Sequence, residues 1–310
     1  MSEQLLIDSH HHFWALDGSV HYPWLEEEVD DHFFLGDYAA IRQPFLPADI
    51  RTLIPPGYRL AGTVHCEAES TRQAPEVETR WLTQLSEQQG LPVALVGWAA
   101  LADPACETQL DRQMDSPLFR GVRAKPVTAA RPDRYDGTLG APGSLQDAGW
   151  TRGLRLLEER ELSWDLRVPA WHLADAARAL EETPNLRVIL NHTGLPWDRS
   201  EPGLARWREG MRALATNPSV AVKLSELGSP MASWDEHQNI ALLAETIGIF
   251  GAERCLYASN FPVTGLNASY ATWLAMVEQA IADAAPDARR AILHDNAVRW
   301  YRLPVLSASD

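Results

Sequence analysis

The chain has 310 residues, a formal net charge of -15 and three cysteines. This charge disfavours non-specific binding to nucleic acid or to an anionic membrane surface. The cysteines, Cys66, Cys106 and Cys255, are widely spaced and form no CxxC motif, which argues against a disulfide framework and indicates a reducing compartment. Because no basic apolar leader and no run of 18 apolar residues is found, we expect a cytoplasmic protein without membrane or nucleic-acid partners.

Residues 5–14 predict an apolar strand that ends in three consecutive histidines. Because side chains alternate along a strand, His10 and His12 are expected to face one way and His11 the other. Two imidazoles on one face can bind a metal ion or a carbonyl group together. The competing interpretations, a polar strand end or a remnant of a purification tag, fit less well because apolar residues flank the histidines on both sides.

Residues 15–46 form a long segment whose aromatic content predicts a packed lid. Its aromatic residues and histidines include His21, Tyr22, Trp24, His32, Phe33, Phe34 and Tyr38. Loops of this length in compact domains are usually either functional or disordered. We therefore expect this segment to close over a bound ligand.

Beyond the lid, short apolar runs alternate with helical periodicity. Further strands are expected at 59–67, 92–99, 119–126, 162–169, 187–192, 219–225 and 254–260. Helices are expected at 75–89, 151–161, 173–182, 203–216, 234–250 and 269–284. An open doubly wound sheet would carry a Gly-rich nucleotide turn near its start, and none is present. The pattern predicts one α/β domain over residues 1–310, a (β/α)8 TIM barrel.

Functional side chains of such a barrel come from the carboxyl ends of its strands, and polar residues concentrate there. They are His65, Glu67, Arg123, Lys125, Asp165, Arg167, His192, Lys223 and Asn260. Each has a structural explanation on its own; Arg167, for example, can simply pair with Asp165. Agreement across several strands at one end predicts a common site. His172 and Glu226 follow strands and can either lean over this site or cap a helix.

Four short motifs in the strands resemble a known group of enzymes. They are His10-x-His12, Leu-Asn-His-Thr-Gly at 190–194, Val-Lys-Leu-Ser at 222–225 and Ala-Ser-Asn-Phe-Pro-Val at 258–263. In this order they resemble the amidohydrolase superfamily. They are most similar to its amidohydrolase-related (amidohydrolase 2) branch, which contains sugar-acid lactonases and the 2-pyrone-4,6-dicarboxylate lactonase. The likeness extends to Asp-Asn-Ala at 295–297 and Tyr-Arg-Leu at 301–303.

The resemblance implies a barrel that hydrolyses a cyclic ester. His10, His12 and His192 would bind one divalent metal ion, zinc if any, or would bind the scissile carbonyl without a metal. One position departs from the family, which commonly ends strand 8 with an Asp that acts as base, whereas this chain has Asn260. An amide cannot accept that proton. The base is then Glu67, Asp165, Glu226 or His172, or hydrolysis has been lost.

The sequence thus predicts a hydrolase that opens a small lactone carrying a carboxylate or several hydroxyls. We expect His192, Asn260, Glu67 and Asp165 to be catalytic, and Arg123, Lys125, Arg167, His172, Lys223, His65 and Trp24 to bind the substrate. The cations would hold an anionic substrate and stabilise the oxyanion. Two alternatives are non-oxidative decarboxylation of an unsaturated or aromatic acid, and a barrel that binds a ligand without turnover. The ring, the metal content and homo-oligomer formation stay open.

Overall fold

Eight parallel strands form one sheet in chain order, β1-β2-β3-β4-β5-β6-β7-β8. The structure is a computed structural model and describes residues 3–27, 33 and 35–304. The strands are β1 (Gln4–His11), β2 (Tyr58–Cys66), β3 (Ala94–Gly97), β4 (Phe119–Val122), β5 (Ser163–Leu166), β6 (Val188–Leu190), β7 (Val220–Leu224) and β8 (Cys255–Tyr257). All eight predicted strands are confirmed.

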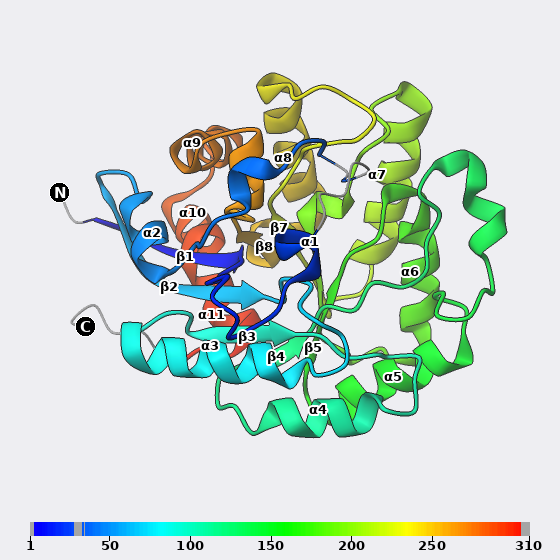
Figure 1. The fold of residues 1–310 in the computed structure, drawn as a ribbon. Coiled ribbons are helices and arrows are strands. Elements are labelled where there is room, and N and C mark those ends of the chain that lie inside the picture. Colours follow the sequence, from blue (N-terminus) through cyan, green and yellow to red (C-terminus); the bar gives the residue numbers. More distant parts are fainter. Residues whose placement is uncertain (1–2, 28–32, 34, 305–310) are drawn as a thin grey trace.

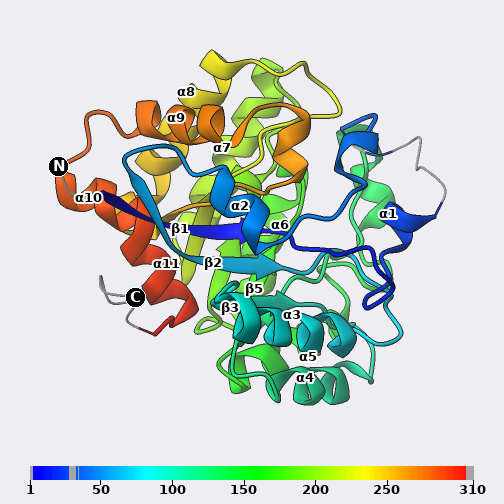
Figure 2. The ribbon, with the colours of Figure 1, turned by 60° about the vertical axis from the view of Figure 1, so that its left-hand side comes forward.

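The first and last strands meet through the residues that follow β8. The Asn260 amide donates to the carbonyl of His10 at 2.7 Å, and the His12 amide donates to the carbonyl of Phe261 at 2.8 Å. These bonds close the sheet, which confirms the (β/α)8 barrel. In Figure 2, β1 and β2 point toward α1 (Pro23–Glu26), and both ends of the chain lie at the opposite side of the molecule.

Helices surround the barrel, as Figure 1 shows. The principal ones are α3 (Glu76–Gln89), α4 (Cys106–Met114), α5 (Ala148–Glu159), α6 (Leu173–Ala179), α7 (Glu201–Ala215), α8 (Glu236–Phe250) and α9 (Tyr270–Ala280). Shorter ones are α2 (Pro47–Thr52), α10 (Pro286–Arg290) and α11 (Asn296–Tyr301). The six predicted helices are all present. No helix within the described residues is both long and apolar enough to cross a membrane.

Apolar side chains fill the inside of the barrel. Ile7, Val64, Val96, Ile189 and Leu256 form one buried cluster there, together with Cys66, Ala94 and Ala221. Side chains at the alternate positions, such as Trp164 and Leu166 on β5, belong to the larger cluster under the helices. Polar groups are therefore excluded from much of the barrel interior and collect toward the carboxyl ends of the strands.

The strands end earlier than their sequence patterns suggest. β6 ends at Leu190 and β8 at Tyr257, so His192 and Asn260 lie in the loops that follow. Both residues have a positive φ, 55° and 56°. The functional side chains are thus placed by loop conformation as well as by strand alternation.

Candidate active site

A cavity of about 330 Å³ opens at the carboxyl ends of the strands. We call it the rim pocket. It is lined by His12, Trp24, Phe33, Tyr38, Ala68, Glu69, Arg123, Lys125, Arg167, His192, Trp197, Asn260 and Val263. Seven of the predicted site residues are among them: His12, Trp24, Arg123, Lys125, Arg167, His192 and Asn260. The volume suits a small organic molecule.

Three imidazoles from two distant parts of the chain converge here: His12 and His192 line the rim pocket, and His10 is fully buried behind them. The ring of His10 lies 4.7 Å from that of His192 and 5.1 Å from that of His12, between centroids. His11 points elsewhere and packs on Phe13, with ring centroids 4.0 Å apart. Burial lowers the pKa of His10 and His192 well below the usual range and that of His12 to about 3. All three imidazoles are therefore neutral at pH 7.

A buried ammonium group determines which ring nitrogen of His10 carries the proton. Lys223 is fully buried, forms an ion pair with Asp165, and places its Nζ 3.1 Å from His10 Nδ1. Because an ammonium group can only donate, His10 Nδ1 accepts and the ring proton sits on Nε2. Tyr301 completes the network by donating its hydroxyl to Asp165 at 2.9 Å. His10 Nε2 has no hydrogen-bond partner among the described residues.

His12 has the opposite arrangement of protons. Its Nδ1 lies 2.7 Å from the carbonyl oxygen of Cys66, which can only accept, so Nε2 carries a lone pair. That lone pair faces Asn260 Oδ1 at 3.1 Å, while Asn260 Nδ2 donates to Glu226 at 3.1 Å. Two acceptors face each other, an arrangement that a cation between them or a reversed Asn260 amide would relieve. Burial raises the pKa of Glu226, and hydrogen bonds from Thr264, the Gly228 amide and Asn260 offset part of that rise.

Cationic side chains form one wall of the rim pocket. The two carboxylate oxygens of Glu67 pair with Arg123 at 2.8 Å and Arg72 at 2.7 Å, and Lys125 pairs with Glu69. Burial, with Arg167 adding to its effect, lowers the pKa of Lys125 to about 8. Burial and the charge of Arg123 lower the pKa of Arg167 to about 10. These shifts show cations crowded together, a setting that favours an anionic ligand.

Two groups of side chains near the pocket carry atoms that could act as metal ligands. His10, Cys66 and Asp165 bring three potential ligand atoms within 4.8 Å of one another. Lys223 already contacts two of these residues, and burial raises the pKa of the Cys66 thiol to about 12. The ammonium group of Lys223 therefore takes the place of a metal ion beside His10, Cys66 and Asp165. The lone pairs of His12 Nε2 and Asn260 Oδ1 fit a divalent ion better, with His192 in the same pocket.

Two predicted substrate-binding residues are not among the lining residues of the rim pocket: the inward orientation expected of His65 is wrong, and His172 lies at the start of a helix, the second of its two expected places. His65 accepts from the Phe13 amide at 3.0 Å and lies 3.4 Å from Glu78 on α3, because Val64 and Cys66 take the inward positions of β2. His172 accepts from the Ala129 amide at 3.0 Å and contacts Asp175 at 3.0 Å, in the turn that begins α6. Both histidines organise backbone and helix ends.

Other predicted residues lie behind the pocket lining. Asp165 and Lys223 are fully buried beneath His10, and Glu67 reaches the pocket only through Arg123. Glu226 is held behind Asn260 and also accepts from Thr264 at 2.8 Å. These positions suit residues that orient others. Their assignment as catalytic or substrate-binding groups stays a prediction.

Several residues of the site were not singled out from the sequence. Ser225 Oγ lies 3.0 Å from His192 Nδ1 and fixes that ring, although it was quoted within the Val-Lys-Leu-Ser motif. Glu69, two positions after Glu67, pairs with Lys125, and Trp197 follows the His192 motif and lies under Arg167 at 5.7 Å. Their places in loops directly after strand ends are the signal that could have marked them. The lid residues His32 and Phe34 lie outside the described residues.

Known proteins are similar to this chain in both sequence and fold. The amidohydrolase family matches residues 7–303. An uncharacterized protein y4mH of Sinorhizobium fredii is 33% identical over 304 residues, 98% of this chain and 100% of its own. An L-fucono-1,5-lactonase of Burkholderia multivorans is 28% identical over 312 residues, covering 97% of both chains. A crystal structure of an amidohydrolase from Burkholderia multivorans with bound zinc is 25% identical, with a TM-score of 0.76 over 97% of this chain and 100% of that one.

A closed barrel with strand-end histidines and a family match over nearly the whole length define the class of this protein. The chain belongs to the amidohydrolase family. The resemblance drawn from the four strand motifs is thereby confirmed. The matched range also includes Asn260, in the loop after β8.

Proposed function

We propose that this protein hydrolyses a small lactone that carries a carboxylate or several hydroxyls. The observation that carries the proposal is that His12, His192 and Asn260 line one cavity with Arg123, Lys125 and Arg167. Neutral imidazoles can polarise a carbonyl or move a proton, and the cations can hold an anionic group of the same molecule. A relative named L-fucono-1,5-lactonase, alike over 97% of both chains, supports a cyclic ester as substrate.

The lactone carbonyl would be activated by hydrogen bonds from neutral imidazole. Lys223 holds the proton of His10 on Nε2, so His10 offers an N–H to the carbonyl oxygen, where negative charge develops during attack. A neutral imidazole donor of this kind keeps its proton while stabilising the oxyanion. His192, held by Ser225, lies beside His10 and would orient the ring.

His12 would accept the proton of the attacking water and return it to the ring oxygen when the acyl C–O bond of the lactone breaks. Its Nε2 lone pair faces the rim pocket lining, and Asn260 lies 3.1 Å away to orient the water. Burial lowers its pKa most, and the charge of Arg123 lowers it further. An anionic substrate beside Arg123 offsets this second effect and raises the basicity of His12 when the substrate binds. The segment 15–46, through Trp24 and Phe33, would cover the ring.

A divalent metal ion, zinc being the expected one, would be held by His12, Asn260 and His192. It would supply Lewis-acid polarisation of the carbonyl. The zinc of the 25% identical Burkholderia multivorans structure is a property of that protein and makes the metal a question for this one. His10 would remain a hydrogen-bond donor in either case, because Lys223 occupies its Nδ1.

The proposal is tested with purified protein and a panel of lactones. The panel contains aldonolactones and carboxylated muconolactones, and hydrolysis is followed by proton release in weak buffer. We expect release from at least one compound, and a loss of about 100-fold or more in kcat for His12→Gln, because removal of a general base costs that much. A His21→Gln variant, at an exposed histidine in the lid, serves as control.

Each measurement is made on chelator-treated protein and repeated after zinc is added. Turnover without metal assigns the chemistry to the side chains alone, and turnover that needs zinc assigns it to the His12, His192 and Asn260 set. Absence of proton release from every compound under both conditions would contradict the proposal.

A further inference from the structure

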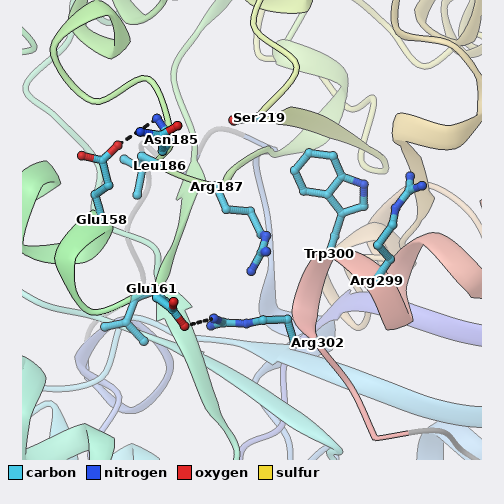
Figure 3. A pocket seen from close by; sticks show the side chains of 10 residues that line it. Glu158, Glu161, Asn185, Leu186, Arg187, Ser219, Arg299, Trp300 and Arg302 are labelled. Carbon is cyan, nitrogen blue, oxygen red and sulfur yellow. Dashed lines mark hydrogen bonds and ion pairs between the residues drawn. The ribbon is translucent and has the colours of Figure 1, made fainter.

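A second cavity, of about 550 Å³, lies at the amino ends of the strands (Figure 3). Leu162, Arg187 and Ser219 line it and directly precede β5, β6 and β7. Arg299, Trp300 and Arg302, at the end of α11, supply another wall. The carboxylates Glu158 and Glu161 line the cavity beside Arg187, Arg299 and Arg302. We call it the amino-end cavity. Because the rim pocket is built from residues that follow the strands, the two cavities occupy opposite ends of the barrel.

Arg187 lines the amino-end cavity with its guanidinium group. Figure 3 shows it extending toward the space between Trp300 and Arg302. Its side chain forms no hydrogen bond or ion pair with any residue that the structure describes. Burial and the charge of Arg302 lower its pKa by more than the charge of Glu161 raises it. The charge of Arg187 is therefore poorly compensated where it stands.

The other two arginines also keep most of their charge for a ligand. Arg302 lies 3.5 Å from Glu161, whose side chain is 86% exposed, and such an exposed pair stabilises little. Arg299 donates to the Glu253 carbonyl and to Asn296 Oδ1, both neutral acceptors. The indole Nε1 of Trp300 is buried and has no acceptor among the described residues. A phosphate or carboxylate group would satisfy these donors together.

The wall of the amino-end cavity is continuous with the network under the histidines. Tyr301 stands between the lining residues Trp300 and Arg302, and its hydroxyl donates to Asp165 at 2.9 Å. Asp165 pairs with Lys223, which contacts His10. A ligand that fixes Trp300 and Arg302 thus acts on the residue that holds this chain of contacts.

We propose that the amino-end cavity binds a small organic polyanion, a phosphate ester or a polycarboxylate, and that its occupancy tunes the rim pocket through Tyr301. Guanidinium groups recognise both anions by paired hydrogen bonds, and the volume accommodates a molecule of metabolite size. The binding step stands independently of the proposed lactonase activity. The tuning step rests on that activity.

Binding is tested by titration calorimetry of the full chain with two probes, inorganic pyrophosphate and citrate. We expect saturable binding of at least one probe, and the better probe identifies the phosphate or the carboxylate class. Arg187→Gln and Arg302→Gln should each weaken it about tenfold, which corresponds to about 1.4 kcal/mol. Arg206→Gln, on an exposed face of α7, makes the same charge change elsewhere and should leave binding unchanged.

A further variant separates this cavity from the cationic rim pocket. The Lys125→Gln variant should still bind the probe. If Lys125→Gln abolishes probe binding and Arg187→Gln does not, the probe occupies the rim pocket, and the proposal is overturned. Absence of binding of both probes at millimolar concentration overturns it as well. Circular dichroism and thermal unfolding verify that every variant is folded.

The tuning step is tested with Tyr301→Phe, which removes only the hydroxyl. We expect the probe to change kcat/KM of the wild type by several-fold and to leave that of Tyr301→Phe unchanged, while calorimetry shows both proteins binding it. An equal effect on both would contradict transmission through Tyr301. If no lactone is hydrolysed, calorimetry still decides the binding step, so the two proposals fail separately.

Discussion

At the scale of single residues, the site depends on where protons and charges sit. Lys223 donates to His10 Nδ1 and the Cys66 carbonyl accepts from His12 Nδ1, so two histidines two positions apart present different groups. One offers an N–H and the other a lone pair. This difference supplies a donor and an acceptor from the histidines themselves, so Asn260, whose amide cannot accept a proton, need not act as the base. It also explains why a buried lysine is retained under an apolar barrel core.

The buried pair of Lys223 and Asp165 should show strong coupling. Lys223→Met leaves Asp165 as an unpaired buried carboxylate, and we expect a loss of about 3–5 kcal/mol in the free energy of unfolding. The double variant Lys223→Met with Asp165→Asn should recover most of that loss, because no uncompensated charge remains. Urea denaturation of the four proteins measures the coupling. Strictly additive losses would show that the two groups act independently.

Stability should decline as pH falls below neutrality. The pKa of His10, His12 and His192 is lowered by burial, to about 3 for His12, whereas an unfolded histidine has a pKa of 6.5. Below pH 6.5 these histidines are protonated in the unfolded chain but stay neutral in the native chain. Each of them therefore lowers the free energy of unfolding by about 1.4 kcal/mol for each unit that the pH falls. Burial raises the pKa of Asp8 to about 6, which offsets part of this loss.

Unfolding of chelator-treated protein is measured by urea denaturation between pH 7 and pH 5. His192→Asn removes one of the three histidines and should lessen the slope by about a third of their combined effect, while His21→Gln should not. A stability that is constant over this range would contradict neutral imidazoles in the native site.

At the scale of elements, the segment after β1 contributes aromatic side chains to the lining of the rim pocket. Trp24 lines the rim pocket, donates its indole N–H to the Ala68 carbonyl at 2.8 Å, and stacks on Phe33 with ring centroids 5.7 Å apart. Trp14 and Tyr38 pack against the same ring. An aromatic layer of this kind presents a flat apolar face to a sugar or lactone ring.

Removal of the Trp24 ring should weaken binding more than chemistry. For Trp24→Ala we expect KM of the best lactone to rise about tenfold, as loss of about 1.4 kcal/mol of contact would produce, with kcat changed only a few-fold. Trp24→Phe keeps a ring and should retain most of the affinity. Steady-state kinetics of the three proteins decide this. A fall in kcat at constant KM would instead place Trp24 in the chemistry.

At the scale of the whole molecule, the barrel could be predicted because strand and helix periodicities alternate along most of the chain. Strand alternation predicted the direction of Lys223 on β7 but did not hold for every residue within a strand. It failed for His65, since the inward positions of β2 belong to Val64 and Cys66. Beyond the strand ends, loops set direction: His172 turns toward Ala129, whereas His192 reaches the pocket with a positive φ. Sequence alternation carries no information there.

The rim pocket is cationic although the protein as a whole has a net charge of -15. Arg123, Lys125 and Arg167 reach one cavity with the histidines although 42 acidic residues are distributed over the sequence. We infer that these cations hold an anionic lactone with its carbonyl directed at the imidazoles.

A crystal structure with a bound carboxylated lactam, a slowly hydrolysed analogue of the lactone ring, tests that claim most directly. We predict that the lactam oxygen accepts a hydrogen bond from His10 Nε2 or His192, and that the carboxylate lies against Lys125 and Arg167. A lactam bound in the rim pocket with its carbonyl directed away from all three histidines, or bound elsewhere on the protein, would contradict the account.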